Sequence, residues 1–509
     1  MCLFRLRGNS SYPPCLRGPS RPSRWATVRT HLLRFDLCQM TELINSFPDF
    51  LGSFGDKRID KRAKQVLQKL TIGRSSSLRQ VTGSEAEQKS FYRLFNNESF
   101  SEQAIEQSIV KRCGQLCNGR HLLCIQDTTE FNLSAQRGRK KADSGLGRTS
   151  KDDVLGFMLH SSLVIDASLE SALGYSYIKT WERKQNSPNR HQRGYHRLPI
   201  EQKESYKWIA AANQSKDLLI EAKSITIIAD RESDIYDLIA SVEEEKVYIV
   251  IRSSFNRRTS EGQKLNDYLN GLLVSHQYDL AVNGDVRKNI SKRIAHIELK
   301  WGKASLQKPK DCSNKQLPYT KEIYIIEARE KAKTKGIHWR LLTTHPVTNA
   351  AEAMQVIEWY KQRWHIEQIH RLLKTEGFRI ERSQLEQGWA IRKLTMLAMM
   401  ATLRILQMML AYQDDHEQPI DEVFDKEEQH CLQKINKTLE GTTKKLKNPA
   451  GVTTLKWATW IIARLGGWKG YASTRKPGPI VLQKGLARFY NMFEGWRLYQ
   501  NFEKDVSAQ

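Results

Sequence analysis

Cysteine is scarce in this chain and follows no pattern typical of a metal site. Eight cysteines are spread over 509 residues. The one cluster, Cys113, Cys117 and Cys124, has a spacing that matches no common zinc motif. We therefore expect structural thiols without disulfides, which makes a reducing cytoplasm the default compartment.

Long apolar runs without polar residues are also missing. The longest apolar segment, 394–412, contains Arg404 and Gln407. A membrane-spanning helix needs about 20 consecutive, predominantly apolar residues. We therefore interpret the segment as a buried core helix and expect no contact with a membrane.

Residues 1–39 lack lysine, although they contain seven arginines and four prolines. They also lack the apolar core and small-residue cleavage site of a signal peptide. We interpret this segment as an upstream extension from a misplaced start codon. The alternative is a disordered basic tail that adds nonspecific affinity for DNA.

Acidic residues are outnumbered in the chain as a whole. The 81 lysines and arginines exceed the 56 aspartates and glutamates, which gives a formal charge of +25. Such an excess attracts nucleic acid of any sequence, because binding to phosphates releases counterions. Charge alone does not distinguish DNA from RNA or from an anionic membrane, so the kind of partner has to come from motifs.

The sequence does contain a helix-like stretch, 360–376, with two contrasting faces. Helical spacing brings polar side chains together on one face: Tyr360, Arg363, Glu367, Arg371 and Lys374. Four aliphatic side chains lie on the opposite face and can pack. A carboxylate among cations suits a metal ion surrounded by phosphates. The alternative is a solvated face with ordinary ion pairs between successive turns.

Two further acids follow short apolar runs. The run 122–125 ends just before Asp127 and the run 225–229 ends at Asp230, so both are predicted to be buried strands. Ligands of open α/β sheets bind beyond the carboxyl ends of strands. Either aspartate alone could instead form a turn or cap a helix. Together with Glu367, they can hold two Mg²⁺ or Mn²⁺ ions about 4 Å apart, which suits phosphodiester chemistry.

With these residues in place, the sequence resembles the DDE transposases of the insertion sequence 4 type. The family signature Tyr-x2-Arg-x3-Glu-x6-Lys is complete in Tyr360, Arg363, Glu367 and Lys374. Other stretches match in the family's order: GDKRIDKRAKQV (55–66), QDTTEFNL (126–133), ESYKWIAAA (204–212), ADRESDIY (229–236), HWRLLTTHPV (338–347) and ARLGGW (463–468). The resemblance covers the chain from about residue 40 to its C-terminus.

The resemblance implies an α/β fold with a ribonuclease H-like catalytic core interrupted by a β-rich insertion. We place the core at 106–385 and the insertion at about 255–345. A helical DNA-binding domain at 40–105 would precede the core. A helical dimerisation domain at 386–509 would follow it.

The resemblance also implies roles for single residues. Asp127, Asp230 and Glu367 would be the catalytic metal ligands. The DNA contacts near them would be Tyr360, Arg363, Arg371, Lys374 and, as a weaker inference, Arg252. His370 lies beside this face and could orient the attacking water, although a solvent-facing histidine fits the sequence equally well.

Three other regions are predicted to contact DNA. The basic run 57–64 includes Arg58 and Arg62, and the segment 74–79 holds three serines and two arginines placed to meet phosphates. Trp339 lies in a strand-like stretch, where tryptophan is more often a core residue. In the related enzymes a tryptophan at this point stacks on a base flipped out of the duplex.

The implied reaction is cut-and-paste transposition in a bacterial cytoplasm, with the protein on the nucleoid. Water frees a 3′-OH at a transposon end, this hydroxyl forms a hairpin with the opposite strand, a second water reopens the hairpin, and the 3′-OH joins target DNA. The partners would be double-stranded transposon ends, target DNA and a second copy of the chain. Two alternatives stay open: another ribonuclease H-like nuclease, and a non-catalytic inhibitor or decayed copy.

Overall fold

The computed structural model describes residues 54–73, 75–141, 143–149, 154–183, 198–242, 244–282, 291–331, 336–413, 417–471 and 475–507. The predictions made for residues 1–39 and for Arg74 lie outside these ranges.

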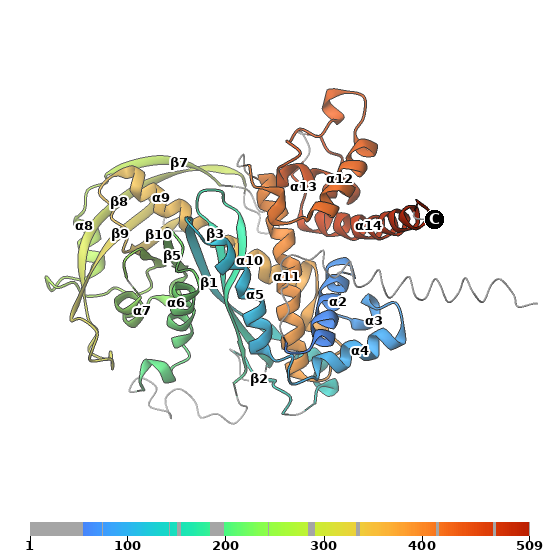
Figure 1. Cartoon of the computed structure of the whole chain (residues 1–509). Helices are drawn as coiled ribbons and strands as arrows, with labels where there is room; N and C mark the ends of the chain where they lie inside the picture. Colours follow the sequence, from blue (N-terminus) through green and yellow to red (C-terminus); the bar gives the residue numbers. More distant parts are fainter. Residues whose placement is uncertain are drawn as a thin grey trace, which may run out of the picture. The chain divides into compact units, whose positions relative to one another are not determined.

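A ten-stranded mixed sheet forms the centre of the described chain (Figure 1). Its first part consists of five strands, in the spatial order β4 (Ala172–Trp181), β3 (Leu155–Asp166), β1 (His121–Asn132), β5 (Ser224–Ala229) and β6 (Val247–Arg252). Strand β3 is antiparallel to β1 and β4, whereas β1, β5 and β6 are parallel. This order and these directions are those of a ribonuclease H-like core, so the predicted fold class is confirmed.

The β-rich insertion widens this sheet and does not form a separate layer. Beyond β6 come β10 (His338–Thr343), β9 (Thr320–Glu330), β8 (Arg293–Gln307) and β7 (His276–Val282), each antiparallel to its neighbour. Helix α8 (Leu265–Gly271) precedes β7, and the short β2 (Gly147–Arg148) borders β3. The insertion therefore returns to the edge of the core before the motif helices begin.

The apolar runs before the two aspartates form buried strands because helices cover them. Residues 122–125 of β1 are completely buried, as is typical of parallel strands with both faces covered. Helices α5 (Glu102–Leu116), α6 (Tyr206–Leu218) and α7 (Tyr236–Ser241) contribute to this core. Cys113, Cys117 and Cys124 are buried free thiols within it, as predicted.

Helix α11 (Gly388–Gln413) joins the remaining helices to the sheet. It contacts β3 and β4, α2 (Lys57–Gly73) and α4 (Glu85–Phe95) of the N-terminal region, and α13 (Leu455–Leu465) and α14 (Pro479–Ser507) of the C-terminal region. Among the described helices it alone is long and apolar enough to cross a membrane, and its apolar stretch is completely buried. The prediction of a buried core helix is therefore confirmed.

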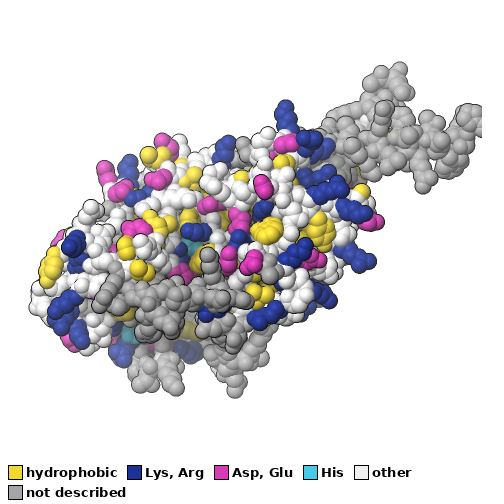
Figure 2. Space-filling model, turned by 90° about the horizontal axis from the view of Figure 1, so that it is seen from below, with side chains coloured by type: hydrophobic (Ala, Val, Ile, Leu, Met, Phe, Trp, Pro, Cys, Tyr) yellow, Lys and Arg dark blue, Asp and Glu magenta, His cyan; other side chains and the backbone are white. Residues whose placement is uncertain are grey.

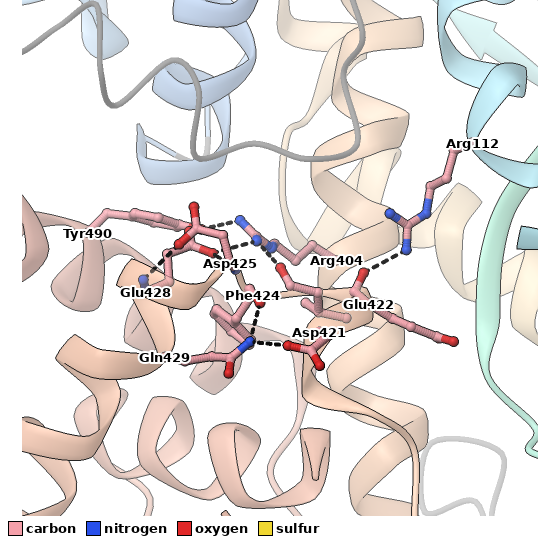
Figure 3. A network of polar contacts seen from close by, with 10 residues as sticks. Arg112, Arg404, Asp421, Glu422, Phe424, Asp425, Glu428, Gln429 and Tyr490 are labelled. Carbon is pink, nitrogen blue, oxygen red and sulfur yellow. Dashed lines mark hydrogen bonds and ion pairs between the residues drawn. The ribbon is translucent and has the colours of Figure 1, made fainter. Parts of the chain in front are cut away.

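A buried polar network fixes the C-terminal helices to α11 (Figure 3). Arg404 of α11 lies 3.3 Å from Glu428 of α12 (Lys426–Leu439), and Tyr490 of α14 donates a hydrogen bond to the same carboxylate at 2.8 Å. Glu428 also accepts the backbone N–H of Asp425 at 2.9 Å and so completes a capping box at the start of α12. Burial of these charges costs free energy that only a complete set of partners offsets.

We expect Glu428→Ala to lower the free energy of unfolding by about 3–5 kcal/mol, because it leaves the Arg404 charge buried without its carboxylate. Asp421 provides the control, since its ion pair with Lys426 at 2.7 Å is exposed. Asp421→Ala should change stability by less than about 1 kcal/mol. Chemical denaturation measures the free energy of unfolding of both variants. Equal losses would show that the buried network contributes no more to stability than the exposed ion pair.

Candidate active site

The parallel pairing of β1 and β5 sets the two aspartates next to each other. Ile125 of β1 is paired with Ile228 of β5. The same register, continued two residues towards the carboxyl ends, places Asp127 beside Asp230. Neighbouring strands lie about 4.8 Å apart, and paired residues project on the same face. The predicted convergence of these two acids thus follows from strand register.

The third member of this row comes from β6. Ala229 of β5 is paired with Ile251 of β6, so the next position sets Asp230 beside Arg252. Arg252 donates a hydrogen bond from Nη2 to the backbone carbonyl of His338 at 3.2 Å. Its guanidinium is thereby held at the edge where β10 begins.

Three acids follow β5, and their contacts separate them. Asp234 is completely buried and accepts two hydrogen bonds from Arg257, at 2.9 and 2.7 Å. Glu232 is exposed and lies 3.8 Å from Lys207. Asp230 accepts the backbone N–H of Glu232 at 2.9 Å and caps the short turn that follows the strand. Asp234 is therefore structural, and Asp230 is the acid that lies in the row with Asp127.

The motif stretch 360–376 is helical but not uniform. Helix α9 (Ala350–Lys361) is followed by a tighter turn, in which the backbone N–H groups of Gln362 and Arg363 donate to the carbonyls three residues before them. Helix α10 (Trp364–Arg371) then starts. A π-helical turn, Leu372–Glu376, follows. Turns of this wider kind are frequent at functional sites. The predicted packing face is confirmed, because Ile366, Ile369, Leu372 and Leu373 are all buried.

Arg363 lies between two of the acids. Its Nη1 is 3.7 Å from Oδ2 of Asp127, and its Nη2 forms an ion pair with Glu367 one turn later. Burial raises the pKa of Asp127 to about 7; the charge of Arg363 opposes this rise, and the charges of Asp230 and Glu367 add to it. The charges of Asp230 and Glu367 therefore both act on the largely buried carboxyl of Asp127.

His370 is buried and does not face solvent. Its Nδ1 lies 3.7 Å from Oδ2 of Asp127, and burial lowers its pKa to about 3. Its Nε2 is buried without a hydrogen-bond partner among the described residues. The sequence-based reading of a solvent-facing histidine is therefore wrong, and a neutral imidazole lies beside Asp127.

Tyr360 and Trp339 extend the site towards the insertion. Tyr360 is buried at the end of α9, and burial raises its pKa while the charges of Arg363 and Arg252 lower it. The Trp339 ring meets the Tyr360 ring edge-on at 6.3 Å and is only half-buried. Trp339 is thus no interior core residue, whereas Tyr360 is buried, unlike the other four residues of the polar face.

The two remaining cations of the motif differ in their surroundings. Lys374 is half-buried on the π-helical turn, 5.4 Å from the centre of the Phe131 ring, and Asp127 is among the charges that act on its pKa. Arg371 is exposed at the end of α10. The structure thus brings Lys374 close enough to Asp127 for their charges to interact.

The donor set at this point fits a divalent cation. Carboxylate oxygens are the ligands that Mg²⁺ and similar hard cations prefer, and the charges of Asp230 and Glu367 add to the larger effect of burial in raising the pKa of Asp127. Within the described ranges no three donors are close enough to form a closed metal cluster. Instead the Arg363 guanidinium supplies the positive charge between Asp127 and Glu367. A cation held by these acids would supply part of the positive charge that Arg363 now provides.

Sequence reasoning missed Trp364. This side chain is 56% exposed on the first turn of α10, directly after Arg363. An exposed tryptophan beside an acid cluster offers a surface on which a base can stack. The signal was available, because helical spacing puts position 364 away from the packing face of Ile366 and Ile369.

The predicted contacts of the N-terminal region lie on α2 and the segment after it. Arg58 is exposed and paired with Asp56 at 3.1 Å, and Arg62 is half-buried. Ser76, however, is buried, and its backbone N–H and Oγ both donate to the turn after the motif helix. The prediction that Ser76 meets phosphate is therefore wrong. On the face drawn in Figure 2, lysines and arginines are interspersed with acidic and apolar side chains.

Two regions of the chain match known protein families. Residues 195–404 match the transposase DDE domain, and residues 52–100 match the transposase DNA-binding domain. The first match includes Asp230 and Glu367 but begins after Asp127. Among solved structures, the chain is similar to piggyBac transposase in a synaptic complex with hairpin DNA, at 10% identity over 74% of this chain and 76% of that one. The TM-score of 0.33 is too low for that likeness to support an argument.

We expect Asp127→Asn to raise the melting temperature of the metal-free protein, and to raise it more at pH 8 than at pH 5. The folded protein holds the Asp127 proton more tightly than the unfolded chain, so this carboxyl removes stability as pH rises from about 4 towards 7. The control variant is Asp311→Asn, which replaces an exposed aspartate. Thermal melts of both variants measure the effect, and an equal gain at both pH values would contradict the raised pKa of Asp127.

Proposed function

We propose that this chain is a DDE transposase that moves DNA by a cut-and-paste route, because residues 195–404 match the transposase DDE domain and residues 52–100 match the transposase DNA-binding domain. A DDE transposase cleaves and joins DNA strands with the help of divalent metal ions. The proposal adds four successive steps at one site: nicking of a transposon end, hairpin formation, hairpin opening and joining to target DNA. We further propose that the chain is of the insertion sequence 4 type and that, within this group, it resembles the transposase of transposon five.

The observation that carries the proposal is the convergence of charges at the carboxyl ends of β1 and β5. Asp127 and Asp230 occupy neighbouring positions there, and Glu367 lies on α10 with Arg363 between it and Asp127. We assign Asp127, Asp230 and Glu367 as the ligands of two Mg²⁺ or Mn²⁺ ions. When bound, such ions activate the attacking oxygen and stabilise the leaving oxygen of a phosphodiester.

The side chains around the acids would hold the DNA. Lys374 and Arg252 offer charges to phosphates, and Arg363 could turn from the acids to a phosphate once metal neutralises them. Tyr360 offers its hydroxyl to the same phosphates. His370 is neutral and buried, which suits a hydrogen bond to the attacking water better than a phosphate contact. Each residue thus binds or orients, which is what repeated in-line displacement at phosphorus requires.

Hairpin formation requires sharply bent DNA, and two tryptophans support this step. Trp339 is half-buried against Tyr360, and Trp364 is exposed beside Arg363. A base that leaves the duplex needs a stacking surface, which is worth about 1–3 kcal/mol per base. We assign Trp339 as that surface, and Trp364 is the further candidate.

We also propose that two copies act together, because two transposon ends need two active sites. Helix α14 offers a surface for this contact. Met492 and Tyr499 lie two turns apart on one side of it, and they are 45% and 58% exposed. A dimer through α14 would be bound to each catalytic core through the buried Arg404 network.

The proposed chemistry predicts that Glu367→Gln binds DNA with transposon ends normally but no longer nicks it. The substitution keeps the shape of the side chain and removes the charge that holds the metal. The matched control is Glu358→Gln on α9, whose exposed carboxylate pairs with Lys361. Purified protein is incubated with Mg²⁺ and DNA bearing the inverted repeats that flank the gene. Nicking by Glu367→Gln at the rate of Glu358→Gln would refute the catalytic assignment.

Trp339→Ala separates stacking from structure. If the ring stacks on a flipped base, nicking should survive and the hairpin product should fall about 5- to 150-fold, as expected for the loss of about 1–3 kcal/mol. Trp301→Ala, on the half-buried tryptophan of β8, is the control. Melting, nicking and hairpin formation are measured on the same preparations. A stable Trp339→Ala protein that forms hairpins normally would refute the stacking role.

A further inference from the structure

The turn after the motif helix joins three parts of the protein that lie far apart in sequence. It spans Phe378–Gln384, and its first residue donates a backbone hydrogen bond to Leu372 at 3.0 Å, which closes the π-helical turn. Phe378 is buried, and Arg379 adopts a left-handed conformation with φ of +52°. Such a conformation is unfavourable for arginine, so it persists only where the surroundings determine it.

Ser76 supplies part of those surroundings. It follows α2 in the region that matches the DNA-binding family and is 3% exposed. Its backbone N–H donates to the Phe378 carbonyl, and its Oγ donates to the Arg379 carbonyl, each at 3.1 Å. One buried serine therefore holds two successive carbonyls of the turn. Ser77 adds a longer contact to Gln384 at 3.4 Å.

The other side of the turn is held by the end of β1. Glu381 accepts the backbone N–H of Asn132 at 2.9 Å, and its own carbonyl accepts Nε2 of Gln136 at 3.1 Å. Lys140 donates from Nζ to the carbonyls of Ser383 and Leu385, at 2.8 and 2.6 Å. Asn132 is the last residue of β1, five positions after Asp127, so the turn is fixed to the strand that carries the first catalytic acid.

The Glu381 carboxylate also acts on Lys374. Burial lowers the pKa of Lys374. Three carboxylates oppose this, and the effect of Glu381 is larger than those of Glu130 and Asp127. A charged lysine at a half-buried position needs such a counter-charge to keep both its proton and its place. Glu381 thus contacts the end of β1 with one oxygen, and its charge acts on the motif lysine.

We propose that the Phe378–Gln384 turn is a positioning element through which Ser76 and Glu381 hold Lys374 in place for its phosphate. The inference rests on the proposed role of Lys374 in binding DNA. The turn connects the region that binds transposon ends directly to the side chain that would meet the phosphate at the acids. Binding at the N-terminal helices and placement of Lys374 would then be coupled through Ser76.

The test compares Ser76→Ala and Glu381→Gln with wild type in nicking of end DNA over a range of DNA concentrations. We expect the rate at saturating DNA to fall about 10- to 100-fold in both variants, because small displacements of a positioned group cost that much. The DNA concentration at half-maximal rate should change by less than about threefold. The control is Thr438→Ala on α12, which removes a similar hydroxyl-to-carbonyl bond of 2.8 Å and should nick normally.

A double substitution shows whether Ser76 acts through Lys374. If it does, Ser76→Ala should slow nicking no further in a Lys374→Ala background, since the group that it positions is gone. Additive losses would assign Ser76 to general stability, and the melting temperature would fall in parallel. Wild-type nicking rates at saturating DNA in both single variants would overturn the proposal.

Hydrogen exchange tests the coupling without catalysis. In free protein, Ser76→Ala should speed amide exchange in residues 372–384, whereas Thr438→Ala should not. If wild type fails to nick while exchange in this segment responds to Ser76, the proposed function fails and the coupling stands. If wild type nicks but neither exchange nor rate responds to Ser76, the coupling fails and the proposed function stands.

Discussion

The parallel pairing of β1 with β5 and of β5 with β6 is the constraint on which the site depends. Parallel strands end at the same edge of a sheet, so three residues far apart in the chain, Asp127, Asp230 and Arg252, form one row. A slip of one residue in either register would turn one acid to the other face. The buried runs before the acids oppose that slip, because each side chain would have to fit into the close packing of the opposite face.

Crowding negative charge at a buried edge is costly, and the helices after the sheet reduce that cost. Arg363 reaches both Asp127 and Glu367, and it does so because the chain tightens just before α10. The π-helical turn that follows changes the helical phase again and sets Lys374 over the Phe131 ring. The two irregular turns thus flank α10, and each carries one of the cations, Arg363 before it and Lys374 after it.

Much of this arrangement could be predicted from the sequence, and the exceptions have physical causes. The strand-end aspartates follow from the short apolar runs before them, and the packing face of the motif helix follows from a period of 3.6 residues. The burial of His370 and Tyr360 does not, because it depends on which element packs above them. The same holds for Ser76, whose serine-rich surroundings suggested a phosphate contact. Its true partners are carbonyls about 300 residues later, a separation that no local pattern can reveal.

The position of helix α11 likewise depends on packing against elements that lie far apart in the sequence. It is bordered by the N-terminal helices, by the sheet and by the C-terminal helices, and its buried Arg404 requires partners from α12 and α14. A helix with so many partners cannot shift without disturbing all of them, because packed interiors respond to strain in discrete steps. The N-terminal helices are therefore joined to the catalytic core along α11 as well as through Ser76. Movement of the DNA-binding region relative to the acids would have to break both connections together.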